Sequence, residues 1–261
     1  MELKVASVEG LRILVTAGAS SIGRAIAEAF VAAGSRVHIC DIDAALLEQT
    51  LQEQPLLRGT LADVGSPQSL DRLFEDAAAW LGGFDVLVNN AGVGGPRALL
   101  ENVAEDAWDD CIRVNLGGPF YCMKRVIPFM KAQRSGCILN ISTSSARTGL
   151  PERSPYVASK AGLIALNANA ARELGPWNIR CNAILPGVVD NPRGNALIER
   201  FGRDNSLSPD QARETFLRYV SMRSMIGMDE IAAMAVFLAS PAARHVSGQA
   251  IGVCGNVEWE S

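Results

Sequence analysis

Short apolar runs alternate along the chain with longer segments of helical character, and this alternation limits the fold more than any other feature. The run at 11–16 is typical, because it is rich in β-branched residues and has no polar face. Strands of that kind need cover on both faces, which helices between parallel strands provide. The pattern therefore predicts an α/β protein with a doubly wound, Rossmann-type parallel sheet and helices on both faces.

About seven strands and the helices between them can be placed from turn residues and helix caps. We expect strands at 11–16, 36–41, 56–64, 84–92, 136–143, 179–187 and 250–255. We expect helices at 21–33, from near 44, from Ser66-Pro67, over 104–132 and from Tyr156 to about Leu174. Because no internal repeat or linker interrupts the pattern, the sequence predicts a single domain over residues 1–261.

The segment 188–227 has a different composition from the rest of the chain. It is richer in Arg, Asn, Asp, Ser and Met, and a helix is expected after Ser208-Pro209. It follows the sixth expected strand, at the end of the sheet where ligands bind in such folds. We therefore expect an insertion within the domain that covers the substrate pocket.

Size and charge exclude several classes of protein. The chain has 261 residues, 48% of them hydrophobic and 20% charged, so it can bury a sizeable core. The formal net charge is -4 and no run of Lys or Arg occurs, so neither nucleic acid nor a membrane surface is an expected partner. No apolar run approaches the ~18 residues that cross a bilayer. Since the N-terminus also lacks a signal-peptide pattern, we expect a cytoplasmic protein.

The cysteines and histidines show no metal-binding pattern. None of the six cysteines forms a CxxC pair, and several lie inside apolar runs. His38 and His245 have no potential metal ligands beside them in the sequence. These residues are predicted to be structural, with free thiols in a reducing compartment and no metal site.

A glycine-bearing turn follows the first expected strand and opens the next helix. Such a turn directs backbone N–H groups, at the positive end of the helix dipole, toward a pyrophosphate. Gly18, Ser20, Ser21 and Ile22 are the candidates for this contact. The alternative is that glycine serves the shape of the turn alone, but the βαβ context favours a nucleotide site.

Asp41 ends the second expected strand, where an acid can accept hydrogen bonds from both hydroxyls of an adenosine ribose. A carboxylate there also repels a 2′-phosphate, which favours NAD over NADP. The alternative roles are a solvated acid or a helix cap. Because Asp43 is the better placed cap, Asp41 remains free for the ligand.

Together with other motifs, the nucleotide turn resembles that of the short-chain dehydrogenase/reductase family, and the likeness extends over nearly the whole chain. The family's glycine motif, Thr-Gly-x3-Gly-x-Gly, corresponds here to Thr16-Ala17-x3-Ser21-Ile22-Gly23. Ala17 and Ser21 therefore stand where the family has glycine. Because Ala and Ser adopt positive φ only at a cost, we expect cofactor binding with a slightly altered turn.

Five further motifs occur in the family's order, which excludes a chance match. They are Asp63-Val64, Asn89-Asn90-Ala91-Gly92, Asn115, Tyr156-Val157-Ala158-Ser159-Lys160 and Pro186-Gly187. The resemblance implies that NAD contacts Asp63, Val64, Asn90, Ala91, Gly92, Tyr156, Lys160, Pro186, Gly187 and Val189. The family often has Thr where this chain has Asn191, and either the Asn191 side chain or the Val189 backbone could meet the nicotinamide amide.

The hydroxyl residue that precedes the catalytic tyrosine departs from the family pattern. The family usually has serine thirteen residues before the tyrosine, and here that position is Thr143. A shift of one residue along an extended segment reverses the direction of a side chain. We therefore predict Thr143 as the catalytic hydroxyl, with Ser142 and Ser144 as second choices.

The family's mechanism suits the residues that this chain carries. An ordinary tyrosine has a pKa near ~10 and is a weak base at neutral pH. Lys160, four residues after Tyr156, lies on the same helix face, and its charge together with oxidised nicotinamide favours tyrosinate. The resemblance implies that Lys160 also binds the nicotinamide ribose, that Thr143 holds the substrate oxygen and that Asn115 holds a water of the proton relay.

The substrate is expected to be polar. In the family, residues between the catalytic hydroxyl and the tyrosine commonly line the pocket, and here they include Ser145, Arg147, Glu152 and Arg153. Such a lining favours a polar substrate, including an anionic one, over a steroid or fatty acyl chain, and the candidates are a sugar, a polyol and a small hydroxy acid. The alternative is that most of these charged residues form a solvated rim.

Three functional hypotheses follow from the sequence. The first is an NAD-dependent alcohol dehydrogenase for a polar small molecule, acting as a homotetramer or a dimer, with Trp259 at an interface or over the pocket. The second is an NADPH-dependent carbonyl or 3-oxoacyl reductase, against which Asp41 argues. The third is a non-catalytic NAD-sensing protein on the same fold. The presence of Asn115, Tyr156 and Lys160 argues against a pure sensor.

Overall fold

Seven parallel strands form one sheet in the computed structural model, which describes residues 7–257. The strand order is β3-β2-β1-β4-β5-β6-β7. The strands are β1 (Arg12–Thr16), β2 (Arg36–Asp41), β3 (Arg58–Leu61), β4 (Val86–Asn89), β5 (Gly136–Ile141), β6 (Ile179–Pro186) and β7 (Ala250–Val253). The order reverses between β1 and β4, and in open α/β sheets ligands bind beyond the strand ends at this point.

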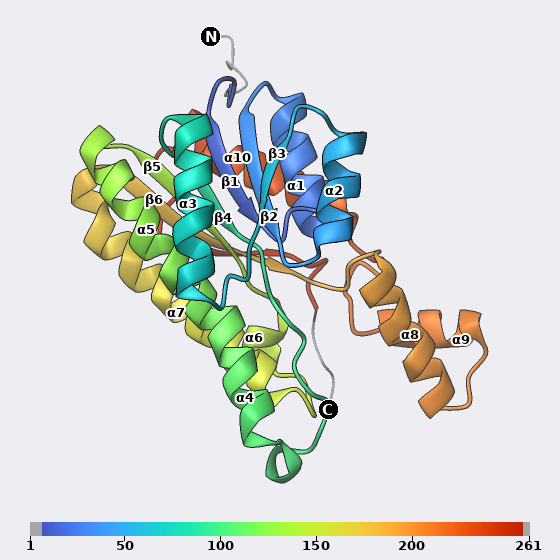
Figure 1. Ribbon diagram of the computed structural model, residues 1–261. Helices are drawn as coiled ribbons and strands as arrows, with labels where there is room; N and C mark the ends of the chain where they lie inside the picture. The colour runs from blue at the N-terminus through green and yellow to red at the C-terminus, as the bar shows by residue number, and fades with distance from the viewer. Residues whose placement is uncertain (1–6, 258–261) are drawn as a thin grey trace.

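Helices cover both faces of the sheet, as expected for a doubly wound fold (Figure 1). One face carries α1 (Ser21–Ala32), α2 (Ala44–Glu53) and α10 (Met228–Ala239). The other carries α3 (Pro67–Leu81), α5 (Gly118–Gln133) and α7 (Ser154–Leu174). The predicted Rossmann-type α/β architecture is therefore confirmed.

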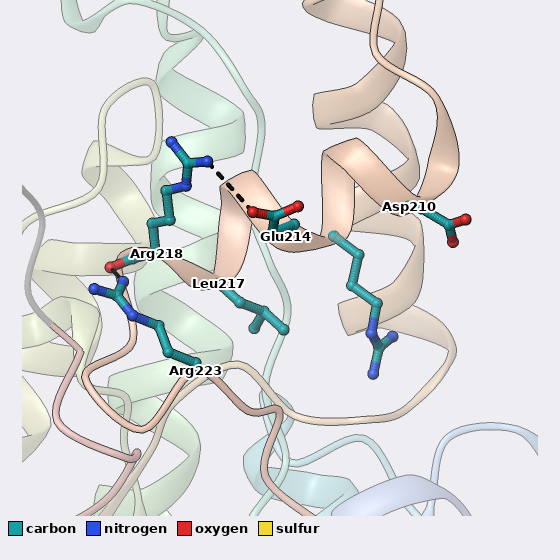
Figure 2. A pocket seen from close by; sticks show the side chains of 6 residues that line it. Asp210, Glu214, Leu217, Arg218 and Arg223 are labelled. Carbon is teal, nitrogen blue, oxygen red and sulfur yellow. Dashed lines mark hydrogen bonds and ion pairs between the residues drawn. The ribbon is translucent and has the colours of Figure 1, made fainter.

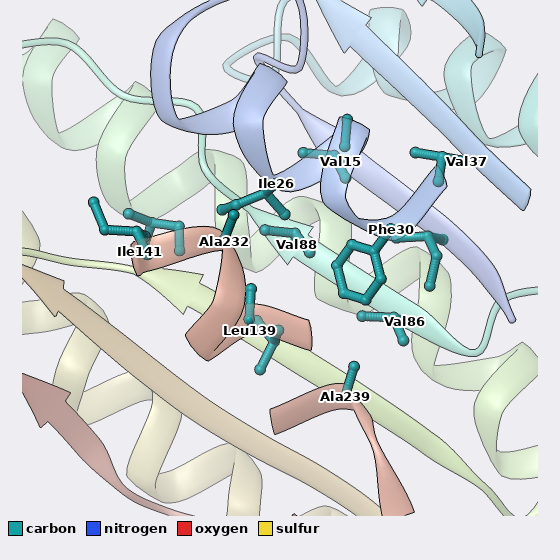
Figure 3. Packing of buried hydrophobic residues seen from close by; sticks show 14 of the residues in the cluster. Val15, Ile26, Phe30, Val37, Val86, Val88, Leu139, Ile141, Ala232 and Ala239 are labelled. Carbon is teal, nitrogen blue, oxygen red and sulfur yellow. The ribbon is translucent and has the colours of Figure 1, made fainter. Parts of the chain in front are cut away.

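The hydrophobic cluster between the sheet and helices α1 and α10 explains why the strands carry apolar residues on this face. Phe30 and Ile26 of α1 pack with Ala232 and Ala239 of α10 over residues of the central strands (Figure 3). All of these side chains are buried. Small alanines on α10 let that helix approach α1 and the sheet closely, so this layer fixes the positions of the strand ends that carry the site.

Most expected elements agree with the structure to within a few residues. Ser66 caps α3, with Pro67 in its first turn, and the Asp43 side chain caps α2, as predicted. The expected strands at 56–64 and 84–92 are shorter than predicted, since β3 ends at Leu61 and β4 at Asn89. After Asn89 the backbone leaves the sheet, because its next N–H groups bind the Thr16 hydroxyl instead of a strand.

The helix expected at 104–132 is interrupted in the structure. It consists of α4 (Glu105–Ile112), a π-helical turn (η2, Arg113–Gly117) and α5. In a regular α-helix, residue 119 would donate to the carbonyl of Asn115, but Pro119 has no N–H. The Gly118 N–H donates to the Arg113 carbonyl five residues back. The proline therefore gives a physical reason for the wide turn at Asn115.

The segment 188–227 forms a pair of helices that projects from the body of the molecule (Figure 1). They are α8 (Pro192–Asp204) and α9 (Pro209–Leu217), the latter capped by Ser208 as expected. Phe201 and Phe216 pack edge to face between them, with ring centroids 5.4 Å apart. Short helical turns complete the described chain: η1 (Leu100–Asn102), α6 (Ser145–Thr148), η3 (Gly175–Trp177) and η4 (Pro241–Ala243). No helix in the described residues is long and apolar enough to span a bilayer.

Candidate active site

The turn after β1 keeps the backbone shape that glycines usually allow. Ala17 and Ser21 have φ of 48° and 47°, in the left-handed region that favours glycine. Gly23 packs so closely that a Cβ there would lie 2.0 Å from the Ala17 carbonyl oxygen. Two residues without glycine's freedom are therefore held in glycine's conformation, and the departure from the family motif results in strain at these positions.

The N-terminus of α1 is free of side-chain caps. The Ser20 side chain makes no cap hydrogen bond, and the first turn contains no acidic residue. Side chains cap the first turns of α2, α3, α8 and α9, whereas α4, α5, α6 and α7 resemble α1 in having no side-chain cap. The first N–H groups of α1 are thus available to an anion, which fits the pyrophosphate of a dinucleotide.

Thr16 and Asn90 hold this turn against the end of β4. The Thr16 hydroxyl accepts from the N–H groups of Asn90 and Ala91, both at 3.0 Å. The Asn90 amide donates to the carbonyls of Thr16 and Ala17, both at 3.1 Å. The predicted cofactor residues Asn90 and Ala91 therefore fix the shape of the nucleotide turn.

Asp41, the predicted partner of an adenosine ribose, lies at the end of β2. It is 7% exposed, and its two carboxylate oxygens accept from the N–H groups of Ala19 and Asp43, each at 3.2 Å. These bonds hold the carboxylate at the end of the strand but leave acceptor capacity on each oxygen. The next side chain, Ile42, is an exposed hydrocarbon and offers no charge to a 2′-phosphate.

The other predicted cofactor residues lie in the loops that follow the strands. Asp63 accepts from the Gly65 N–H at 2.8 Å and pairs with Arg113 at 3.2 Å, while Val64 is buried. Gly187 approaches β7 so closely that a Cβ would lie 2.7 Å from Cα of Cys254. Pro186 ends β6, and Val189 is buried beside Ile226. Ile22 is partly buried near the start of α1.

Tyr156 and Lys160 share α7, one turn apart, as the sequence predicted. Tyr156 is partly exposed, whereas Lys160 is only 4% exposed and donates to the Ile141 carbonyl at 2.7 Å. Burial, with a smaller contribution from the charge of Arg193, lowers the pKa of Lys160 to about 8. A Cβ at Gly92 would lie 3.1 Å from the Lys160 amine. The bare glycine therefore leaves room for the lysine below the turn that follows β4.

Asn115 is bound to the catalytic helix between Tyr156 and Lys160. Its amide donates to the Ser159 hydroxyl at 3.0 Å, and that hydroxyl donates to the Tyr156 carbonyl at 2.8 Å. The Asn115 side chain also exchanges two hydrogen bonds with the backbone of Val93. The π-helical turn, α7 and the loop after β4 are thus joined at one buried amide.

The candidate hydroxyls beyond β5 differ in their bonds. Ser142 donates to the Lys160 carbonyl at 2.9 Å, so its proton is used in the contact between β5 and α7. The Thr143 hydroxyl accepts from the Ser145 N–H at 3.3 Å and keeps its own proton for another partner. Ser144 precedes α6 and makes no cap bond with its side chain. Thr143 and Ser144 are therefore better able than Ser142 to bind a substrate oxygen.

The structure brings together only some of the predicted substrate residues. Arg153 precedes α7 and donates to the carbonyls of Gly94 and Gly95, at 3.1 and 3.0 Å. Glu152 pairs with Arg97 of the same loop region. Ser145 opens α6, and Arg147 instead reaches the Ala250 carbonyl of β7, at 2.5 Å.

Arg193, one of the polar residues of the segment 188–227, is a functional candidate whose place beside Tyr156 the sequence did not indicate. Its guanidinium carbon lies 5.3 Å from the centre of the Tyr156 ring, close enough for a cation–π contact. The arginine belongs to the first turn of α8, far from the tyrosine in the sequence. Its membership in the polar segment 188–227 was the only signal in the sequence. Trp259, proposed for an interface or a lid, lies outside the described residues.

A hollow lies beside α9, and other residues than these line it. Figure 2 shows its lining, which consists of Asp210, Arg213, Glu214, Leu217, Arg218 and Arg223. Arg218 and Glu214 form an ion pair at 3.4 Å across one turn of the helix. None of the predicted site residues lines this hollow, so it is not the catalytic cleft.

Comparisons with known proteins agree with this geometry. A family model described as "Enoyl-(Acyl carrier protein) reductase" matches residues 16–256. The chain is 35% identical to the 3-oxoacyl-acyl-carrier-protein reductase FabG of Thermotoga maritima, over 96% of this chain and 98% of that protein. It is 36% identical to the probable galactose dehydrogenase GalD of Rhizobium meliloti, over 94% of each chain.

Solved structures with either nicotinamide cofactor are also similar to this fold. A variant of actinorhodin polyketide ketoreductase with NADPH has a TM-score of 0.90 and 31% identity, covering 94% of this chain and 96% of that one. NAD+-bound xylitol dehydrogenase has a TM-score of 0.88 and 27% identity, covering 95% of this chain and 98% of that one. The relatives therefore share the fold but differ in cofactor.

Proposed function

The chain belongs to the short-chain dehydrogenase/reductase family, and on that premise we propose that it is an NAD-dependent oxidoreductase that interconverts an alcohol and a carbonyl. The substrate is a polar small molecule such as a sugar, a polyol or a hydroxy acid. The residues that end the strands and open α1 fit a dinucleotide, since an uncapped helix terminus follows β1 at the switch point of the sheet and a fixed carboxylate ends the neighbouring strand β2.

The chain's own residues account for the proton that leaves the substrate. Tyr156, as tyrosinate, accepts the hydroxyl proton, and the Lys160 cation stabilises that ionised form. Thr143 donates to the substrate oxygen, and Asn115 holds the π-helical turn against α7 where a water can relay the proton. Bound NAD supplies the acceptor for the hydride that leaves the carbinol carbon.

The position of the Asp41 carboxylate at the end of β2 is the single observation that supports NAD over NADP. This carboxylate is buried, is held by two backbone N–H groups and faces no described cation within ion-pair distance. A 2′-phosphate beside it would meet a like charge, which costs several kcal/mol at a desolvated contact.

The ratio of kcat/KM with NAD to kcat/KM with NADP tests this assignment directly. We expect the wild type to favour NAD by more than about 100-fold, and Asp41→Ala to lower that ratio by at least about tenfold. Asp43→Ala is the matched control, since it removes a neighbouring carboxylate whose described role is to cap α2. A wild type that prefers NADP would overturn the proposal.

A second candidate is an NADPH-dependent carbonyl or 3-oxoacyl reductase. It is favoured by the likeness to FabG and to the ketoreductase with NADPH. It requires the same α7 residues with a different nucleotide preference, so the cofactor ratio separates the two candidates. A protein that binds NAD and turns over nothing in a broad substrate panel would instead support the NAD-sensing hypothesis.

We also propose a cytoplasmic homotetramer, with a dimer as the alternative. Phe120 and Phe129 on α5 are 47% and 41% exposed, although both are large aromatic side chains. A second copy of the chain would cover such residues. The free cysteines at all six positions are consistent with a reducing compartment.

A further inference from the structure

Four arginines and two acids form a cluster that reaches Tyr156 through Arg193, and their pairing is unequal. Arg97 pairs with Glu152 and lies 3.7 Å from a carboxylate oxygen of Asp204. Arg200 lies 3.7 Å from the same carboxylate oxygen. Within the described residues, the other two arginines, Arg153 and Arg193, form no ion pair with an acid. The nearby acids therefore form their ion pairs with Arg97 and Arg200, and no described acid forms an ion pair with the other two guanidiniums.

These two guanidiniums lie close together at the reacting side chain. A Cβ at Gly94 would lie 2.8 Å from a terminal nitrogen of Arg193 and 3.5 Å from one of Arg153. Arg193 lies over the Tyr156 ring, with its guanidinium carbon 5.3 Å from the ring centre. Arg153 is fixed by the Gly94 and Gly95 carbonyls, which use one of its terminal nitrogens. The rest of its guanidinium fork keeps free donors.

This arrangement is unfavourable without a negative partner. Burial lowers the pKa of Arg153, and the charges of Arg193, Arg97 and Arg200 lower it further. Like charges held together at the edge of an active site are typical of a position that binds the opposite charge. Arg153, which is held by two carbonyls, and the exposed Arg193 can together enclose a small anion.

We propose that Arg193 and Arg153 bind the carboxylate of a hydroxy acid whose carbinol lies at Tyr156; this rests on the proposed function. Because Arg193 is stacked on the ring that carries the reacting hydroxyl, the carboxylate lies one or two carbons from the carbinol. The substrate class is thus a 2- or 3-hydroxy acid. In the reaction the carbinol carbon gives its hydride to NAD and its hydroxyl proton to Tyr156. The products are the oxo acid and NADH, and the carboxylate is unchanged.

A carboxylate fits this position better than a phosphate does. Two planar guanidiniums match the two oxygens of a carboxylate. A phosphate would need further donors, and the adjacent N-terminus of α8 does not provide them. There the Asn191 side chain already accepts from the Gly194 N–H at 2.7 Å, and Pro192 has no N–H. The anion site is therefore built chiefly from the two arginine side chains.

Matched charged and neutral substrates test the proposal in the holoenzyme with NAD. The pairs are lactate with lactamide and 3-hydroxybutyrate with 3-hydroxybutyramide. We expect at least one acid to be oxidised with a kcat/KM at least about tenfold above that of its amide. Arg193→Leu should lower kcat/KM for the acid by about 10–100-fold, chiefly through KM, because charge-assisted hydrogen bonds are lost. Because the Arg193 charge also acts on Lys160, kcat/KM for the amide should fall too, but by a clearly smaller factor than for the acid, and Arg193→Lys should retain part of the preference for the acid.

Arg203→Leu is the matched control, since it removes the same charge from an exposed position at the other end of α8. It should leave both substrates within about twofold of wild type. If Arg193→Leu lowers kcat/KM for acid and amide equally, the arginine acts through Tyr156 or through the fold, and the proposal is overturned. Equal turnover of acid and amide by the wild type also overturns it.

Calorimetry with sodium malonate, without any cofactor, separates this inference from the proposed function. We expect malonate to bind the wild type and Arg203→Leu, and to bind Arg193→Leu at least about tenfold more weakly. Malonate binding of this kind without oxidation of any alcohol would contradict the proposed function and support the anion site. Oxidation of neutral alcohols without malonate binding would support the proposed function and contradict the anion site. Tighter binding of inorganic phosphate than of malonate would overturn the carboxylate assignment.

Discussion

At the scale of single residues, the turn after β1 differs from the family motif in sequence but keeps the backbone conformation that glycine favours. Ala17 and Ser21 replace family glycines, yet both keep a left-handed backbone. A residue with a Cβ pays roughly 1–2 kcal/mol in that conformation. The neighbouring contacts, in particular the Asn90 amide on the Ala17 carbonyl, hold the turn in this shape. A strained backbone conformation of this kind persists only where contacts with the surrounding structure hold it in place.

Ala17→Gly should therefore stabilise the protein, although most substitutions to glycine destabilise. Relief of the left-handed strain exceeds the added freedom of glycine in the unfolded chain, so we expect the free energy of unfolding to rise by about 0.5–1 kcal/mol. Urea denaturation measures this change. Ala79→Gly is the control, because Ala79 is exposed in α3 and its replacement should cost about 1 kcal/mol. A loss of stability in both variants would show that Ala17 is not strained.

His38 is a second residue whose environment sets a measurable property. Its Nε2 lies 3.0 Å from the Thr60 hydroxyl, which in turn donates to Asp76, so Nε2–H is the donor. The other ring nitrogen is buried without a partner among the described residues. Burial lowers the pKa of His38 to about 4, and the charge of Asp76 opposes this only in part. The native state therefore keeps His38 neutral under conditions in which the unfolded chain takes up a proton.

The depressed pKa of His38 should leave the free energy of unfolding unaffected above about pH 6.5 and should lower it progressively as the pH falls from there toward about 4. In that window the unfolded state binds one more proton than the native state, so acid favours unfolding. Between about pH 7 and pH 4.5 the wild type should lose about 2–3 kcal/mol more than His38→Gln. Urea denaturation of both proteins at the two pH values measures the difference. Equal losses would mean that His38 titrates normally in the folded protein.

At the scale of elements, the strands and most helices were predictable from the sequence, whereas the π-helical turn was not. Strands buried on both faces carry their signal in local composition, and caps such as Ser66 mark helix starts. The break at Asn115 depends on the missing N–H of Pro119 and on the bond from Asn115 to Ser159 of another helix. Apolar periodicity continues across such a turn, so the pattern predicts one long helix.

The polar pair Ser21 and Asn191 links two elements at positions where the chain departs from its family. Asn191 donates to the Ser21 hydroxyl at 2.8 Å, and its side-chain oxygen caps α8 through Gly194. One side chain thus joins the nucleotide turn to the projecting segment 188–227. The sequence shows that Ser21 and Asn191 each differ from the family pattern. It does not show that the two side chains meet, because 170 positions separate them.

Asn191→Ala should loosen α8. The loss of the cap costs about 1 kcal/mol and the loss of the Ser21 bond adds to it, so amide hydrogen exchange in 192–204 should become several-fold faster. Ser208→Ala is the matched control, since Ser208 caps only α9 and its loss should speed exchange in 209–217. If the exchange rates of the α8 amides are the same in Asn191→Ala as in the wild type, the Asn191 cap does not limit the opening of α8.

At the scale of the whole molecule, the site is assembled from segments that the sheet brings together. The motifs that each lie within a few residues, such as Tyr156 with Lys160, could be found by spacing alone. Arg193 could not, because its place over Tyr156 depends on the tertiary position of the start of α8, 37 residues further along the chain. Local patterns therefore predict the reaction class, and non-local packing determines which substrate is bound.

Formation of NADH by the wild type and by Tyr156→Phe tests the central claim most directly, with hydroxy acids, polyols and sugars as substrates. The wild type should oxidise at least one of them, and Tyr156→Phe should lower kcat by at least about 10²–10⁴-fold, because the base is lost. Fluorescence titration should show nearly unchanged NADH binding in the variant. Turnover by Tyr156→Phe at the wild-type rate would contradict the account.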